Sequence, residues 1–348
     1  MRRLIPVLTL CLMLMMTGCS AALPFNKVVF TTGFEKDEVF RIEDSTCTLS
    51  EAMVYLVGTQ GGYEKTFGKD IWNADTDSGT VEQRLKDSVL AKIAQIKVMN
   101  LLARENGIEL DQSEEQQVLE AAQEYYDTLT DADIAAMNGV TVQDMEGIIR
   151  EQAIADKLYD YIIRDINPEI SDDEARTITV EQIFIKTYSL DGEGNKVPFS
   201  DDEKDAAYRR CREIFKNLLN GGSFEELMAQ YNEADEGTIS FGKGEKDAEF
   251  ETAAFNLGTE QTSEIIETQD GYAILKCIST FNREETEANK VKIVAQRKRE
   301  VFGAQYDAFV ATLTKQLNQK LWDSVELVDD ENVTTTGFME VYEQYFHS

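Results

Sequence analysis

The chain has 348 residues, and its 65 Asp and Glu residues outnumber its 34 Lys and Arg residues, which gives a net charge of −31. Such an acidic surface repels nucleic-acid phosphates and argues against a nucleic-acid-binding role. The one histidine, His347, is next to the last residue. Its position argues against a His-rich zinc site and against Ser-His-Asp or Cys-His catalysis, and we expect neither a metal nor a cofactor.

The N-terminus has the features of a secretory signal. Two arginines precede an apolar run over residues 4–16, and Thr-Gly-Cys follows at 17–19. The run is shorter than the ~20 residues that a membrane-spanning helix needs. The Met-Thr-Gly-Cys ending resembles a bacterial lipobox, which implies cleavage after residue 18 and lipidation of Cys19; a secretory signal with an incidental cysteine is the alternative. We expect a signal peptide over 1–18 and an extracytoplasmic protein held on the cell membrane by lipid at Cys19.

Residues 19–175 are predicted to form a helical domain. Residues 27–42 are β-prone on both sides of Gly33, which predicts two short strands. Capping boxes and apolar residues at helical spacing then predict three helices. These run from Thr80 to Asn106-Gly107, from Ser113 to Leu129, and from Thr141 to the Asn-Pro pair at 167–168. We interpret their apolar stripes as core packing.

The pattern changes at a capping box over 171–174, and residues 176–283 are predicted to form a separate domain. A β-branched run at 177–189 predicts a strand, and serines 200 and 223 begin two helices. A strand at 238–241, a helical turn at 250–257 and two strands within 263–279 follow. The order β-α-α-β-α-β-β predicts a compact α+β domain. Cys211 and Cys277 lie among apolar residues, and we interpret them as buried thiols rather than a disulfide.

Residues 284–348 are predicted to contain a long helix over 284–321, a strand-like segment at 324–328 and an acidic tail. A helix of about 38 residues would span ~57 Å, which is too long for packing on the small domain alone. We therefore expect the helix to return to the N-terminal helices, so that both chain ends build one domain around the inserted one.

Several stretches of the inserted domain carry a family pattern. VEQIFIK at 180–186 is followed by GGSFEELMAQYNE at 221–233, a glycine-bearing strand at 237–244, and AEFETAAFNLGTEQTSEIIETQDGYAILKC at 248–277. Together, residues 178–279 resemble the parvulin family of peptidyl-prolyl cis–trans isomerases, or rotamases. The whole arrangement is similar to PrsA- and SurA-like foldases, in which a parvulin domain is inserted into a helical chaperone domain. The resemblance implies a role in protein folding and secretion, with unfolded or newly secreted polypeptides as partners.

Rotation about an X-Pro bond has a barrier of ~18–20 kcal/mol, and lowering it requires an apolar cup and polar groups that favour the twisted amide. The resemblance places the two family histidines at Gln182 and Ala273, and the family Asp or Cys near Glu233 and Ala234. The methionine of the proline cup corresponds to Lys246. The cup residues that remain are Phe250, Phe255, Leu257, Ser263 and Thr268. Core packing is an equal alternative for the two phenylalanines.

Because both histidine positions are replaced, we expect weak or absent isomerase activity and a folding factor that acts mainly as a chaperone. Its negative charge suits basic clients and also serves solubility. Two alternatives stay open. One is a fully active peptidyl-prolyl isomerase, and the other is a solute-binding lipoprotein of a transporter, which predicts alternating β-α units in two similar lobes.

Overall fold

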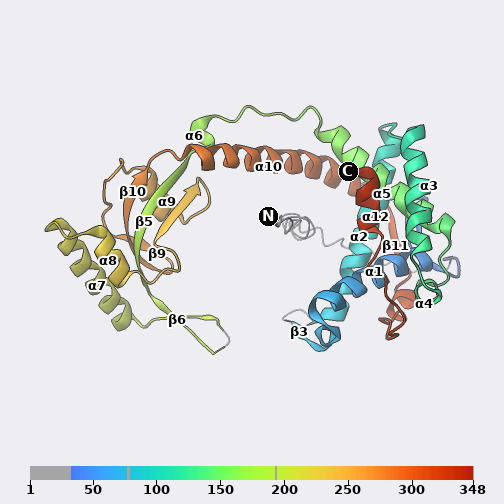
Figure 1. Ribbon diagram of the computed structural model, residues 1–348, viewed down its shortest axis with the longest axis horizontal. Coiled ribbons are helices and arrows are strands. Elements are labelled where there is room, and N and C mark those ends of the chain that lie inside the picture. Colours follow the sequence, from blue (N-terminus) through green and yellow to red (C-terminus); the bar gives the residue numbers. More distant parts are fainter. Residues whose placement is uncertain (1–32, 77–78, 193, 348) are drawn as a thin grey trace, which may run out of the picture. The chain divides into compact units, whose positions relative to one another are not determined.

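The computed structural model describes residues 33–76, 79–192 and 194–347 (Figure 1). The predicted signal peptide, Cys19 and residues 27–32 lie outside this range. The described residues form two compact units. One runs up to Asp165 and resumes at Glu300, and we call it the helical unit; the other extends from Ile166 to Arg299, and we call it the sheet unit. The fold is α+β, as predicted. None of the described helices is long and apolar enough to cross a membrane.

The three predicted helices of the helical unit are α2 (Val81–Glu105), α3 (Gln112–Asp127) and α5 (Val142–Ile163). Thr80 and Thr141 cap α2 and α5 as expected, each through its side-chain oxygen. The cap of α3 differs, because the Asp111 carboxylate, and not Ser113, accepts the first backbone N–H groups. The remaining short elements here are η1 (Lys69–Asn73), β3 (Asp75–Thr76), β4 (Gly79–Thr80) and α4 (Asp131–Ala136).

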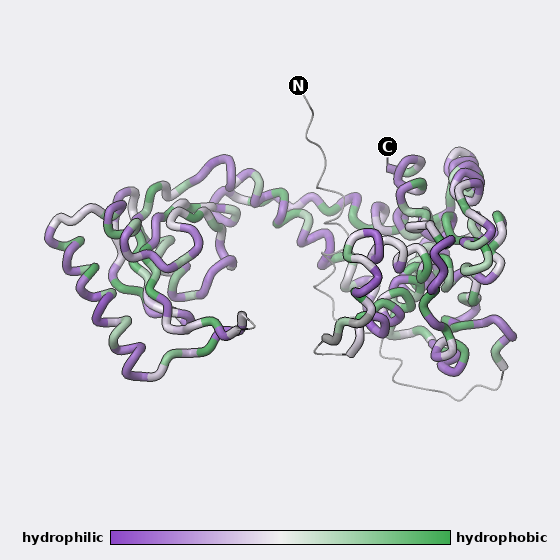
Figure 2. The backbone as a smooth tube through the Cα atoms, turned by 60° about the horizontal axis from the view of Figure 1, so that its bottom comes forward, coloured by the Kyte–Doolittle hydropathy of each residue, from purple (hydrophilic) through white to green (hydrophobic). Residues whose placement is uncertain are grey.

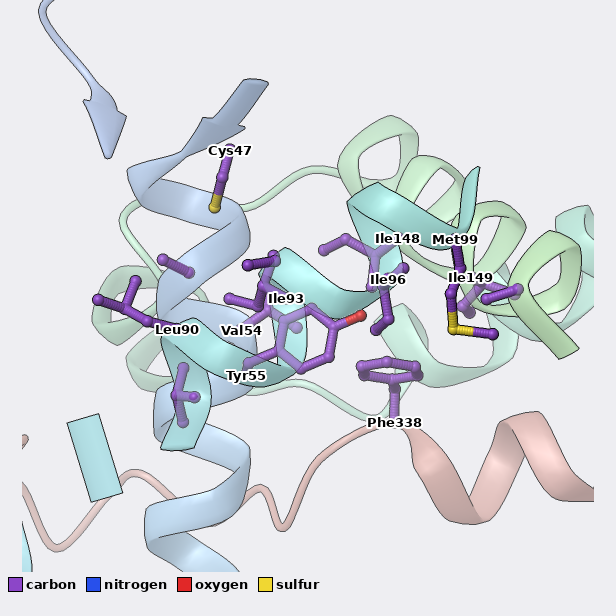
Figure 3. Packing of buried hydrophobic residues seen from close by; sticks show 14 of the residues in the cluster. Cys47, Val54, Tyr55, Leu90, Ile93, Ile96, Met99, Ile148, Ile149 and Phe338 are labelled. Atoms are coloured by element: carbon purple, nitrogen blue, oxygen red, sulfur yellow. The ribbon is translucent and has the colours of Figure 1, made fainter. Parts of the chain in front are cut away.

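The first helix of this unit, α1 (Leu49–Phe67), is missing from the sequence prediction. Residues 51–58 are all buried, so apolar side chains surround the helix and leave no stripe that a search for amphipathic helices would detect. Tyr55 packs edge-on against Phe338, with ring centroids 5.4 Å apart, among buried side chains of α2 and α5 (Figure 3). Burial on all sides, rather than amphipathic spacing, therefore characterises residues 51–58 of α1.

An antiparallel sheet joins the two ends of the described chain in the order β11-β1-β2. Its strands are β1 (Glu38–Ile42), β2 (Ser45–Thr48) and β11 (Lys315–Leu317). Of the two strands predicted on either side of Gly33, the second corresponds to β1, and the first lies outside the described residues; the chain reverses after β1 at Glu43 and Asp44. Glu43 adopts a φ of 50°, and Phe40 lies opposite Cys47 in the resulting hairpin.

The long C-terminal helix, α10 (Arg283–Val310), ends at Val310 and not at Leu321 as predicted. The leucines at 313, 317 and 321 continue the helical spacing, but residues 315–317 form β11 and pair with β1. The Thr314 N–H donates to the Glu43 carboxylate at 2.6 Å, and the Glu43 N–H donates to the Thr314 carbonyl. Pairing with a strand edge therefore overrides the helical period. Phe302 and Tyr306 of α10 belong to the core of the helical unit.

The C-terminal segment, predicted as an acidic tail, contributes aromatic side chains to the core of the helical unit. Residues 324–328 are coil, and they lie between α11 (Gln319–Asp323) and α12 (Met339–Phe346). Phe338 and Tyr342 are buried, and the Tyr342 hydroxyl donates to Asp156 of α5 at 2.6 Å. The acidic residues at 326, 329, 330, 331 and 340 are exposed, and Glu343 is half-buried.

The C-terminal segment also approaches the backbone of α1 closely. A Cβ atom at Gly61 would lie 2.2 Å from the Thr335 carbonyl oxygen, and one at Gly58 would lie 2.6 Å from the Gly337 Cα. Real atoms do not approach so closely, so both helix positions require glycine for packing.

Gly61→Ala should lower the free energy of unfolding by about 1–3 kcal/mol, because the new methyl group overlaps the Thr335 carbonyl. Gly62→Ala is the matched control, since its Cβ meets open space and alanine is favoured over glycine in a helix by ~0.8–1.0 kcal/mol. Urea denaturation measures both changes. Equal stabilities of the two variants would contradict this packing.

The sheet unit is built on an antiparallel sheet of order β8-β5-β10-β9, with α7 and α8 on one face and α9 on the other (Figure 1). Ile183 and Ile185 of β5 face α7 and α8, whereas Ile178 and Val180 face α9. The elements in chain order are α6 (Asp172–Ala175), β5 (Thr177–Lys186), β6 (Tyr188–Leu190), β7 (Lys196–Pro198), α7 (Asp201–Leu219), α8 (Phe224–Tyr231), β8 (Thr238–Gly242), α9 (Ala248–Phe255), β9 (Ile266–Thr268) and β10 (Gly271–Ser279).

The predicted succession of strands and helices in this domain is confirmed, and apolar residues recur along its strands (Figure 2). The small hairpin β6–β7 is an addition, because it flanks the stretch 191–195 that the sequence predicts as a loop. Cys211 and Cys277 are buried free thiols in hydrophobic clusters on opposite faces of the sheet.

Candidate functional site

A pocket of about 460 Å³ opens on the α9 face of the sheet in the sheet unit. Its walls come from β5, the segment that precedes β8, the β8–α9 loop, α9 and the turn between β9 and β10. The lining residues are Gln182, Phe184, Ala234, Gly244, Glu245, Lys246, Asp247, Phe250, Thr268 and Asp270. Five of the residues singled out in the sequence thus lie together here: Gln182, Ala234, Lys246, Phe250 and Thr268.

The two positions of the family histidines share the pocket face of the sheet. Gln182 lies opposite Leu275, and Ala273 lies opposite Phe184, so residues 182 and 273 are diagonal neighbours at roughly 7–8 Å. The Gln182 amide nitrogen donates to the Glu236 carbonyl at 2.9 Å, and its backbone N–H donates to Gly237 at 2.7 Å. The Ala273 side chain is fully buried and has no polar atom. The amide of Gln182 therefore bonds to the neighbouring segment and not across the sheet.

Glu233 does not line the pocket. Its carboxylate accepts the backbone N–H of Lys186 at 2.7 Å and pairs with Arg210, while its own N–H donates to the Phe184 carbonyl. These contacts continue the hydrogen bonding along the edge of β5 into the segment just before β8. The structure thus places Glu233 as a support of β5, and its neighbour Ala234 contributes to the pocket wall.

Glu233→Ala should destabilise the sheet unit by about 1–3 kcal/mol, because the Lys186 N–H and the Arg210 guanidinium both lose their acceptor. Glu233→Gln keeps an acceptor oxygen for Lys186 and should cost less. Chemical denaturation of both variants, compared with binding of a proline-containing peptide at a temperature where both are folded, provides the measurement. Loss of binding in Glu233→Gln at unchanged stability would show a direct role in the pocket.

Phe250 serves the core and the pocket at once. Its side chain is 6% exposed and lines the pocket, and its ring packs on Phe241 at 5.7 Å between centroids. The two sequence-based interpretations of Phe250 therefore coexist. Phe255 instead packs edge-on against Phe241 and lies under the Arg176 guanidinium at 4.9 Å, without lining the pocket.

The other predicted cup residues also differ in whether they line the pocket. Thr268 lines the pocket, and its hydroxyl donates to the Gly271 carbonyl at 2.9 Å across the β9–β10 turn. Ser263 accepts the Leu275 N–H and donates to the Glu264 carbonyl, so its hydroxyl is used within the backbone network. Leu257 is buried in the cluster behind the pocket.

Several lining residues escaped the sequence analysis. Phe184 follows Gln182 by two positions in a strand, so the period-two rule could have placed both on one face. Asp270 pairs with Lys196 from β7, and this hydrogen bond raises the pKa of Lys196. Glu245 and Asp247 reach the pocket through the path of the β8–α9 loop, for which the sequence carries no periodic signal.

The described ranges contain no group of three His, Cys, Asp or Glu side chains that could hold a metal ion. The lining residues of the pocket offer apolar contact, hydrogen bonding and charge.

Residues 183–279 match the family described as rotamase, the PPIC-type PPIase domain. The chain thus contains a parvulin-type rotamase domain, and it lies within the sheet unit.

A longer part of the chain is similar to proteins named foldase protein PrsA. The relative from Halalkalibacterium halodurans is 25% identical over 229 residues, which cover 63% of this chain and 65% of the relative. The relative from Caldanaerobacter subterraneus subsp. tengcongensis is 25% identical over 219 residues, which cover 61% and 62%. The matches thus span slightly less than two thirds of these relatives.

A solved structure is also similar to this chain. It is a crystal structure of peptidylprolyl isomerase (PrsA) from Bacillus cereus, which is 22% identical in sequence. The match covers 77% of this chain and 97% of the Bacillus cereus chain, with a TM-score of 0.37. The predicted resemblance to parvulins and PrsA-like foldases is confirmed.

Proposed function

We propose that this chain is a folding factor that binds proline-containing segments of unfolded or newly secreted polypeptides and acts mainly as a chaperone. One observation carries the proposal. The pocket of the rotamase domain keeps aromatic side chains, Phe184 and Phe250, beside positions 182 and 273, which hold an amide bonded to the backbone and a buried methyl group.

Aromatic walls favour binding, whereas catalysis requires groups that stabilise the twisted amide more than the planar one. The Gln182 amide nitrogen already donates to Glu236, and the Thr268 hydroxyl donates to Gly271. Ala273 offers no polar atom. Each 1.36 kcal/mol of missing transition-state stabilisation lowers a rate tenfold, so the loss of such groups reduces turnover more than affinity.

The place of action in this proposal is the outer face of the cell membrane. The signal-like N-terminus and the Met-Thr-Gly-Cys sequence support secretion and lipidation at Cys19. Acyl chains contribute ~0.8 kcal/mol for each buried methylene group, so two or three chains hold a protein on a membrane surface. The similarity to proteins named foldase PrsA supports the same role.

Cys19→Ser in the full-length chain should move the protein from the membrane fraction to the soluble fraction of the producing cells, because the thiol that carries the lipid is absent. Cys47→Ser is the matched control and should stay with the membrane, since Cys47 is a buried thiol of β2. Unchanged membrane association of Cys19→Ser would contradict the anchor.

Two assays on residues 20–348 test the chaperone proposal. We expect little acceleration of cis–trans exchange in an X-Pro peptide, measured by NMR, and suppressed aggregation of a reduced, unfolded client at equimolar protein. Phe250→Ala should weaken peptide binding by removing an aromatic wall. Since Phe250 also packs on Phe241, Phe184→Leu serves as a second and milder variant, and Phe281→Ala, exposed and outside the pocket, is the control.

A rate far above the uncatalysed one, lost in both pocket variants, would establish a fully active isomerase instead. Aggregation that proceeds unchanged would contradict the chaperone role.

A further inference from the structure

The rim of the pocket carries an excess of negative charge. Three carboxylates line it, from Glu245, Asp247 and Asp270, whereas Lys246 is the one basic residue in the described lining. Asp270 is already paired with Lys196. Glu245 and Asp247 are exposed and form no ion pair with any described residue. Two carboxylates without an ion-pair partner among the described residues thus lie beside the aromatic wall.

The lysines nearby offset these two charges only in part. Lys246 is exposed and lines the same pocket, with its ammonium 5.8 Å from the centre of the Phe241 ring, so the lining keeps a net negative charge of three carboxylates against one ammonium. Lys243, in the same loop, pairs with Asp173 at 3.1 Å. Lys196 pairs with Asp270, and the negative charge of Asp247 also contributes to the raised pKa of Lys196. Lys196 therefore offsets part of the negative charge, on its own side of the pocket.

The loop that carries the two carboxylates is held in place. The Gly244 N–H donates to the Glu251 carboxylate of α9, and Gly244 adopts a φ of +83° that suits glycine. A Cβ at the preceding Gly242 would meet the Asn289 amide at 2.5 Å, so this end of the loop is tightly packed against α10. The backbone that leads to Glu245 and Asp247 is therefore anchored at Gly242 and Gly244.

We infer that the pocket selects proline-containing segments in which a lysine or arginine adjoins the proline. The inference rests on the proposed function, since it assigns a substrate class to the same pocket. The aromatic wall receives the proline ring, and the cationic side chain reaches the carboxylates of Glu245 and Asp247 at the rim. A segment with an acidic residue beside the proline meets repulsion at the same place.

Interactions between partly exposed charges are individually weak. Two such contacts should make a Lys-Pro peptide bind about three- to tenfold more tightly than an isosteric Met-Pro peptide. The preference should shrink as salt is raised, because exposed charges are screened within ~10 Å at 0.1 M ionic strength.

The test uses residues 20–348 and three fluorescent peptides of sequence Ala-X-Pro-Phe, with X as Lys, Met or Glu. Fluorescence anisotropy should give affinities in the order Lys, Met, Glu. The double variant Glu245→Gln/Asp247→Asn should bring the Lys and Met peptides to nearly equal affinity. Lys246→Met should strengthen the preference for the Lys peptide.

The matched control is Glu249→Gln/Asp202→Asn, which removes the same charge from exposed positions outside the pocket. It should keep the preference, whereas an equal loss in this control would assign the effect to the charge of the whole chain and overturn the inference. Equal affinity for all three peptides, or a preference for Glu, would overturn the inference and leave the proposed function standing. Absence of binding by every peptide would overturn both.

Discussion

The pairing of β5 with β10 is the constraint on which the functional half of this protein depends. Its antiparallel register sets residues 182 and 273 diagonally on one face and places Phe184 over Ala273. Because side chains alternate along a strand, the same register sends Ile183 and Ile185 to the opposite face, where α7 and α8 bury them. A shift of one residue would exchange the two faces and remove the pocket.

The part of β5 that extends past its pairing with β8 explains how the polar residues of the site are used. Residues 232–237, just before β8, run along this part of β5 and bond to the backbone of Gln182, Phe184 and Lys186. Glu233 and the Gln182 amide are both committed to this junction. Their hydrogen bonds stabilise the strand that forms the pocket floor.

In the helical unit, segments from both ends of the described chain pack together. β11 pairs with β1, and the segment around Thr335 and Gly337 packs on glycines of α1. Buried aromatic residues of α12 and Tyr55 of α1 then share one core. The acidic composition of the C-terminal stretch did not indicate this shared core, because only its few aromatic side chains supply the packing.

The sequence by itself determined the elements that local chemistry defines. Caps and amphipathic spacing located α2 and α5, and the ordered motifs of residues 178–279 identified the parvulin domain and five of the pocket residues. Only the tertiary structure decided the rest. The buried part of α1 shows no amphipathic period in its sequence. Leu313 and Leu317 have helical spacing, but the backbone of residues 315–317 pairs with the edge of β1 instead. Likewise, the chain position of Glu233 indicated a site residue, but hydrogen bonds to a strand edge, formed only in the fold, direct its carboxylate elsewhere.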